Sequence, residues 1–588
     1  MRADTNYRQV LPIDFGLLLV LALPLIILIF NRSWIYNPAV TIDPWVYNGF
    51  FFRLKQYMDA FGGTYYASRL SWLLPGYLAY QLLPPIVANY VLHLGFYYLA
   101  TISLYLILKF TVSPRIALFV TLLLGWYDYF LLAIGWDYVD GAGVAYYLLT
   151  TLMLTCSVFL KLWRLFLFLG GIACGATIYT NLVWVALVPA LLCYYGVINR
   201  HRRNSLVASC LMFGLGFVFI TVLLGFFNVA FNQPFLFFSA SLSIAKVLVS
   251  RPNSWAVDWR LWYFSATWLL LPLYAFTSSV IGLVFQQVKQ IRTQKSENIN
   301  LNAFQLGCVL NMLAMVSIHL KGTPVLQHMF YISCLIPFTF LGIAAQLEWG
   351  AKYIPAYYFR FLIFAFLFLS GLSYVLPYNV FSLLPAVPFI SLLLVCFLTK
   401  SRRYLLQKVI ISLALSILFI LYNSSILNWR KEGSINFVGP PDPTLGSKKS
   451  SNSYNPEEGF MVVMKTQAIL KEIDPKVRLR FWYDLNESLV YRSISSSNLW
   501  GYRLIGEKFP DFQNPLQPIN ASVNLEQLRK QLAESPQIAI LSNRSDAFQQ
   551  AQRSLKQVGF DAELVSSYDI AHNDTRFTLT VIKISKMN

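Results

Sequence analysis

The chain has 588 residues, of which 57% are hydrophobic and 16% aromatic, while only 12% are charged. This composition excludes an ordinary soluble protein and predicts a chain that crosses a membrane many times. The formal net charge of +19 does not indicate nucleic-acid binding, because most of the excess basic residues lie in short loops between apolar segments.

Apolar segments long enough to cross a bilayer, which takes about 17–25 residues each, occur about thirteen times before residue 430. The first starts near residue 14, and the last ends near residue 424. The segments at 116–133 and 325–346 each count as one span. Little polar sequence separates 164–179 from 181–198, and the total number of spans depends on whether these segments form one span or two. The sequence therefore predicts a polytopic α-helical membrane protein with about 13 transmembrane helices.

The loop charges indicate the orientation. With the N-terminus in the cytoplasm, 18 of the Lys and Arg residues before residue 430 fall in cytoplasmic loops and 8 fall outside, as the positive-inside rule expects. The chain is then an integral plasma-membrane or inner-membrane protein whose C-terminal part is extracytoplasmic. Six early carboxylates collect on the same outer face: Asp43, Asp59, Asp128, Asp137, Asp140 and Asp258.

The last part of the chain has a different composition. A transmembrane domain at 1–429 is followed by residues 430–455, which are rich in Gly, Pro, Ser and Lys and predict a linker. Residues 456–588 then predict an extracytoplasmic soluble α/β domain. Helical periodicity occurs at 460–473 and 545–558, and strand patterns occur at 477–483, 537–541, 562–567 and 577–584.

The first external loop, residues 31–78, carries the first candidate site. A carboxylate next to a bilayer is costly unless it is solvated, paired or used, so Asp43 is the first candidate for the chemistry. Capping is an equally open role, because Asp43 followed by Pro44 is a good helix start. Alternating aromatic and polar residues at 45–61 predict a helix lying in the membrane interface. Arg69, later in the loop, is either a functional contact or an interfacial anchor.

Later outer loops contain the remaining candidates. Asp137 and Asp140 lie three residues apart and would share one face of a helix that begins there. They could bind a cation, or orient a base and a substrate hydroxyl, and the alternative is capping of the next span. Arg251, Lys321 and His328 are candidates for substrate binding, through a lipid phosphate in the case of the two basic residues, and anchoring at the membrane face is their alternative.

These segments resemble the GT-C fold lipid-linked glycosyltransferases (family 39), which include protein O-mannosyltransferases, the aminoarabinose transferase of lipid A and RgtA-like relatives. The resemblance covers roughly residues 10–425. Segment 41–45 lies where the family has an essential acid, and 66–76 resembles the Arg-containing end of its first loop. Segment 135–140 matches the second-loop acid region, and 327–337 resembles a late segment before an apolar span.

The resemblance implies a donor sugar on a polyprenyl phosphate and an acceptor hydroxyl on a lipid, glycan or protein. It implies that Asp43 acts as general base, with inversion at the anomeric carbon. Arg69, with Lys321 or Arg251, would stabilise the phosphate leaving group. Asp137 would orient the acceptor or contact a divalent cation, the one cofactor that the pattern leaves open.

Two other classes remain open. A transporter or flippase of lipid-linked sugars should carry polar groups near the bilayer midplane, with broken helices and an inverted repeat. Here the acids lie at span ends on one side and no repeat is found, which favours an enzyme. The third class is a non-catalytic assembly protein for cell-envelope polysaccharides. An enzyme predicts that Asp43, Asp137 and Arg69 converge on one cavity.

Overall fold

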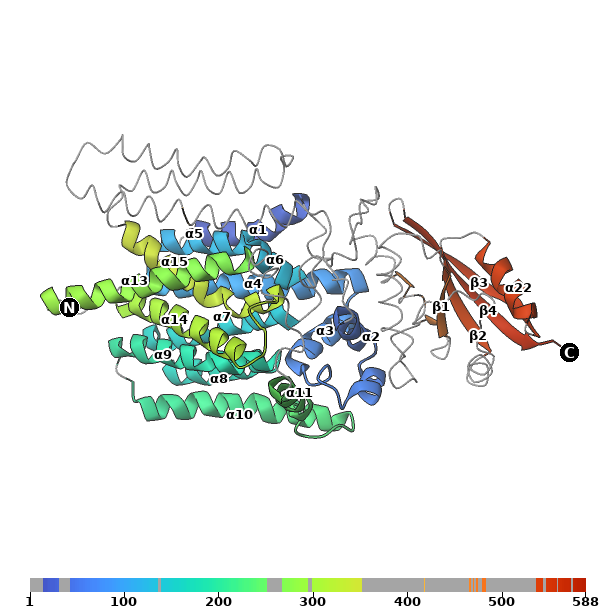
Figure 1. The fold of residues 1–588 in the computed structure, drawn as a ribbon, viewed down its shortest axis with the longest axis horizontal. Helices are drawn as coiled ribbons and strands as arrows, with labels where there is room; N and C mark the ends of the chain where they lie inside the picture. The colour runs from blue at the N-terminus through green and yellow to red at the C-terminus, as the bar shows by residue number, and fades with distance from the viewer. Residues whose placement is uncertain are drawn as a thin grey trace.

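The computed structural model describes residues 14–30, 43–135, 139–202, 204–250, 267–293, 299–351, 417, 465–466, 469, 472–473, 478–482, 536–542, 546–557, 559–572 and 575–587. The described helices form a bundle of elongated, roughly parallel rods (Figure 1). A sheet near the C-terminus lies beyond one end of the bundle, the end that carries α2 and α3 (Figure 1).

The α-helices of the bundle are α1 (Phe15–Phe30), α2 (Asp43–Phe61), α3 (Leu70–Leu82), α4 (Pro85–Thr111), α5 (Pro114–Trp126), α6 (Asp128–Gly135), α7 (Val139–Phe159), α8 (Trp163–Ile178), α9 (Val188–Ile198), α10 (Leu206–Ala230), α11 (Ser239–Ser250), α13 (Leu270–Thr293), α14 (Ile299–Leu320) and α15 (Ile336–Ala351). Short 3-10 helices lie between them: η2 (Leu182–Leu187), η3 (Asn199–His201), η4 (Thr267–Leu269) and η5 (Met329–Cys334).

Several of these helices have the length and composition of membrane spans. Within the described residues six qualify, or seven if the bent pair α5–α6 is one span. Only 11% of the α10 span is buried, and large apolar side chains such as Leu211, Phe219 and Phe226 face outward. Because lipid, unlike water, solvates such a surface, the chain is an integral membrane protein. The last three predicted spans, between 354 and 424, lie outside the described residues apart from residue 417.

The predicted span at 116–133 is bent, because two helices cover it. α5 ends at Trp126, and the chain bends by 61° before α6 continues. Tyr127 has an extended backbone (φ −73°, ψ 119°), so the helical hydrogen bonds are interrupted there. The hydroxyl of Tyr97 donates to the carbonyl of Gly125 at 3.1 Å and so satisfies a group near the end of α5.

Two other boundaries involve 3-10 helices. α8 ends at Ile178, and the Asn181 side chain caps η2 by accepting from the amide of Val183 at 3.2 Å, so the separation of 164–179 from 181–198 is confirmed. In the predicted span at 325–346, the α-helix starts only at Ile336, because the 3-10 helix η5 precedes it. Pro337 occupies the first turn of α15, where its missing N–H costs nothing.

α2 and α3 pack against each other at one end of the bundle. The aromatic side chains predicted to face the lipid interface are buried in the protein instead. Tyr47, Phe50 and Phe51 are all fully buried, and Phe51 contacts Trp72 of α3 edge-on, with ring centroids 5.4 Å apart. The aromatic residues of α2 therefore build the core around the first loop.

α8 and α10 approach closely because glycine faces backbone on both helices. A Cβ added at Gly171 would meet the carbonyl oxygen of Phe213, and one added at Gly216 would meet the carbonyl oxygen of Phe168. Small residues that allow this approach are common where membrane helices pack.

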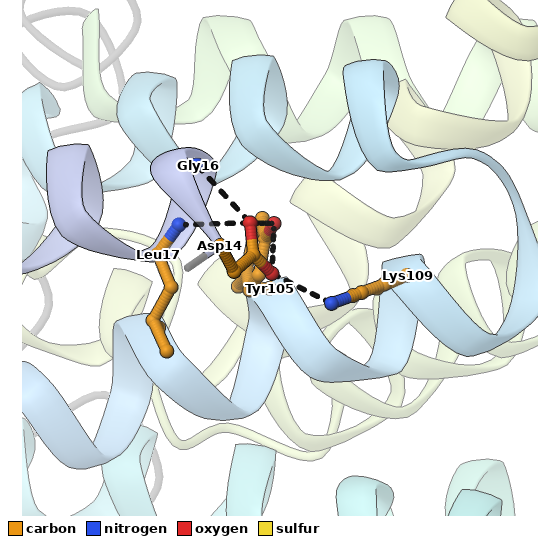
Figure 2. Close-up of polar contacts among 5 residues, drawn as sticks. All are labelled: Asp14, Gly16, Leu17, Tyr105 and Lys109. Atoms are coloured by element: carbon orange, nitrogen blue, oxygen red, sulfur yellow. Dashed lines mark hydrogen bonds and ion pairs between the residues drawn. The ribbon is translucent and has the colours of Figure 1, made fainter. Parts of the chain in front are cut away.

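At the start of the bundle, Asp14 ties α1 to α4 (Figure 2). Its carboxylate accepts from the amides of Gly16 (3.1 Å) and Leu17 (3.4 Å), and so caps α1. Tyr105 donates to both carboxylate oxygens at 2.8 and 2.9 Å, and Lys109 Nζ lies 2.6 Å away. The ammonium of Lys109 lowers the pKa of Asp14, which precedes α1, below its usual value.

The C-terminal part forms a four-stranded sheet in the order β1-β2-β4-β3. The strands are β1 (Arg478–Trp482), β2 (Gln537–Ser542), β3 (Phe560–His572) and β4 (Thr575–Lys586). β1 and β2 are parallel, and the other pairs are antiparallel. Helix α22 (Ala547–Gln557) packs on the sheet through a core that includes Leu555 and Ile540. The predicted strands and the second predicted helix are thus confirmed, whereas the linker at 430–455 lies outside the described residues.

Candidate functional site

Arg69 lies immediately before the first residue of α3 and is only 9% exposed. Its guanidinium carbon lies 4.9 Å from the ring centroid of Tyr65 and 5.6 Å from that of Tyr47, distances typical of cation–π contacts. Arg69 Nη1 also donates to the hydroxyl of Tyr47. A guanidinium held between two tyrosine rings does not reach out to lipid, which argues against the interfacial-anchor alternative.

The chain around Arg69 is fixed to several helices. Ser68 Oγ contacts Ser241 Oγ on α11, and Ser71 Oγ donates to the carbonyl of Ala176 on α8 at 2.7 Å. The hydroxyl of Tyr146 on α7 donates to the carbonyl of Ser71 at 3.1 Å. The start of α3 is thereby held against three other helices, and the position of the Arg69 backbone is set by them.

Asp140 lies in the first turn of α7 and is 2% exposed. Ser333 of η5 donates to Asp140 Oδ1 at 3.4 Å, and Arg69 interacts with the carboxylate electrostatically. In the described part of the chain, Asp140 Oδ2 has no hydrogen-bond partner. A buried carboxylate oxygen left unpaired is costly, so this atom is a strong candidate for contact with a ligand.

Lys321 and His328, two of the candidates for substrate binding, lie in different surroundings. Lys321 is exposed in the turn after α14, consistent with its alternative as an anchor at the membrane face. His328 is partly buried and immediately precedes η5, the 3-10 helix whose Ser333 reaches Asp140. Of these two, His328 therefore belongs to the segment that contacts Asp140.

The other predicted site residues are only partly described. α2 begins at Asp43, one helical turn before Tyr47, and the Asp43 side chain lies outside the described part. Asp137 and Arg251 lie outside the described residues altogether. The backbone thus brings the start of α2 near Arg69 through Tyr47, and the predicted roles of Asp43, Asp137 and Arg251 stay predictions.

Three residues of this site were not singled out from the sequence: Tyr47, Tyr65 and Ser333. The two tyrosines lie in the same loop as Arg69, but 35 tyrosines occur in the chain and no spacing marks these two. Ser333 lies 193 residues from Asp140, so only the fold reveals the contact.

The described residues contain no group of three or more His, Cys, Asp or Glu side chains that could hold a metal ion. Because Asp137 and the Asp43 side chain are outside this set, the divalent cation remains a prediction. The chemistry available at the described site is therefore that of one buried cation, one buried carboxylate and the hydroxyl groups around them.

No protein-family model matches the chain, and no curated protein matches it in sequence. Two solved structures are similar to it. One is ArnT from Cupriavidus metallidurans bound to undecaprenyl phosphate, with 13% identity, coverage of 96% of this chain and 98% of that chain, and a TM-score of 0.46. The other is the apo state of the same protein, with 13% identity, 87% coverage of both chains and a TM-score of 0.38. Because both TM-scores lie below 0.5, we infer the function from the residues of this chain.

Proposed function

We propose that the protein is a membrane glycosyltransferase that moves a sugar from a polyprenyl-phosphate donor to an acceptor hydroxyl on the extracytoplasmic face, with inversion. The observation that carries this proposal is that Arg69 and Asp140 are both buried and interact electrostatically. A buried arginine suits a phosphate, and a buried carboxylate with an unpaired oxygen suits a sugar or acceptor hydroxyl.

Arg69 stabilises the leaving group in this reaction. As the bond between the anomeric carbon and the phosphate oxygen breaks, negative charge develops on the phosphate. A guanidinium that is already held in position by Tyr47 and Tyr65 stabilises that charge without reorganising. Arg251, Lys321 and His328 are the candidates for further contacts with the lipid-linked substrate.

Asp43 is the proposed general base. It takes the proton of the acceptor hydroxyl while the new C–O bond forms, and polyprenyl phosphate leaves from the opposite face of the sugar. Its position at the start of α2 puts it one turn from Tyr47, which contacts Arg69. Asp137 orients the acceptor or contacts a divalent cation. The positive-inside charge pattern supports a cytoplasmic N-terminus and an outer location for these groups.

The test is a transfer assay on the full chain in lipid nanodiscs, with a panel of undecaprenyl-phosphate sugars and candidate acceptors. We expect release of undecaprenyl phosphate together with a new glycosidic bond. Replacing Asp43 with Asn should lower the rate by about 10²–10⁴-fold, because the general base is lost. Asp59→Asn is the matched control, since Asp59 is an exposed acid on the same helix.

Full activity of Asp43→Asn would refute its role as base. A protein that moves these lipids across a bilayer in proteoliposomes, without forming a new bond, would instead be a flippase. A protein that does neither would support the assembly-factor alternative.

A further inference from the structure

A second unpaired group lies one helical turn along α7 from Asp140. Trp184 of η2 is 1% exposed, and within the described residues its indole Nε1 has no hydrogen-bond partner. The ring edge lies against Gly143, because a Cβ added at Gly143 would be 2.6 Å from Nε1. Gly143 follows Asp140 by three positions, so both lie on the same face of α7. The absence of a side chain at Gly143 lets the indole reach that face.

The two unpaired atoms are chemically complementary. The indole N–H of Trp184 can only donate, and the ionised carboxylate of Asp140 can only accept. Helix positions three apart have Cβ atoms about 5–6 Å from each other. One oxygen atom with two hydrogen bonds of about 2.8–2.9 Å spans a similar distance. η5, which brings Ser333 to Asp140, packs against both α7 and η2, so the two groups border one region.

We propose that Trp184 and Asp140 form a subsite for one hydroxyl of the transferred sugar, an inference that rests on the proposed glycosyltransferase function. The hydroxyl accepts from Trp184 Nε1 and donates to Asp140 Oδ2. The ring of Tyr147 packs against the indole of Trp184, with ring centroids 5.1 Å apart, and helps to hold it in position. A sugar with an ammonium group at this position has no lone pair that could accept from the indole N–H. A deoxy sugar has neither a donor nor an acceptor there. The subsite therefore selects a hydroxyl at this position of the sugar.

Trp184→Phe is the most direct test, because it keeps an aromatic ring and deletes the N–H. Binding is measured in nanodiscs for undecaprenyl phosphate and for a panel of undecaprenyl-phosphate sugars. We expect the affinity for the best-bound sugar lipid to fall about five- to tenfold, and the affinity for undecaprenyl phosphate to stay unchanged. Gly143→Ala should give a comparable selective loss, because the added methyl group displaces the indole.

Trp72→Phe is the matched control. Trp72 is also 1% exposed, and within the described residues its Nε1 is unpaired, but it packs beside Phe51, Phe96 and His93 and is not among the atoms nearest to Gly143. This variant should bind both kinds of lipid as the wild type does. A Trp72→Phe variant that loses sugar lipid selectively would overturn the assignment to Trp184.

The remaining outcomes separate the subsite from the proposed function. Equal loss of both lipids in Trp184→Phe would mean a structural role and would overturn the subsite. Wild-type protein that binds sugar lipids no better than undecaprenyl phosphate would also overturn it, while leaving phosphate binding by the enzyme intact. If neither lipid bound the wild type, both the subsite and the glycosyltransferase proposal would fail.

Discussion

Removing the charge of Arg69 should reveal the free-energy cost of burying the Asp140 carboxylate. Asp140 is 2% exposed, and its described contacts are one long hydrogen bond of 3.4 Å from Ser333 and the charge of Arg69. Arg69→Met keeps an apolar stem and deletes the cation. Loss of one partner of a buried ion pair costs about 3–5 kcal/mol, because the other charge stays buried. Because Arg69 acts on Asp140 through its charge, and Ser333 still contacts the carboxylate, we expect a smaller loss of about 1–2 kcal/mol.

The same reasoning predicts that a second substitution repairs the first. Asp140→Asn in the Arg69→Met background removes the uncompensated charge and should recover about 1 kcal/mol of the loss. The free energy of unfolding is measured for the wild type, both single variants and the double variant in one detergent. If the two losses add in the double variant, Arg69 and Asp140 are not energetically coupled and the pair is not the centre of the site.

Two further predictions concern the membrane bundle. Gly216→Ala should lower the free energy of unfolding by about 1–3 kcal/mol, because its Cβ would meet the backbone of α8. Gly214→Ala on the same helix is the control: its Cβ would enter open space, so thermal melts should show a neutral or slightly stabilising effect. Asp14→Asn should cost about 1–2 kcal/mol at pH 7, since it weakens the α1 cap and the contact with Lys109. The pKa of Asp14 is lower in the folded than in the unfolded state. The wild type should therefore keep its stability advantage over Asp14→Asn above the unfolded-state pKa and lose it as the pH falls through the folded-state pKa. Thermal melts of both proteins over a series of pH values would detect this change.

The positions of most described spans could be predicted from the sequence because lipid leaves the backbone few choices. A run of apolar residues must satisfy its own hydrogen bonds, so it becomes a helix wherever it is long enough. The break between α5 and α6 could not be predicted in this way. At this break Tyr97 of α4 donates a hydrogen bond to the carbonyl of Gly125, and the apolar periodicity of 116–133 does not indicate such a partner from another helix.

The charged members of the site were predictable for a related reason. Charges are rare in the membrane part, so Arg69 and Asp140 stand out without any alignment. Tyr47, Ser333 and Trp184 belong to residue types that are common in this chain, and their roles arise from contacts between distant segments. Their spacing in the sequence contains no signal, and only the packing of α2, α7, η2 and η5 identifies them.

The electrostatic interaction between Arg69 and Asp140 also bears on the order of events in the proposed reaction. A sugar on a polyprenyl phosphate carries one negative charge in the diester, whereas free polyprenyl phosphate is a monoester with a charge of about −1.5 to −2 at neutral pH. Arg69 balances one charge, so the donor is tolerated beside Asp140. After transfer, the additional charge lies near a buried carboxylate whose single described cation is Arg69. Repulsion between Asp140 and the product therefore favours departure of polyprenyl phosphate, and Asp140→Asn should slow product release relative to chemistry in single-turnover measurements.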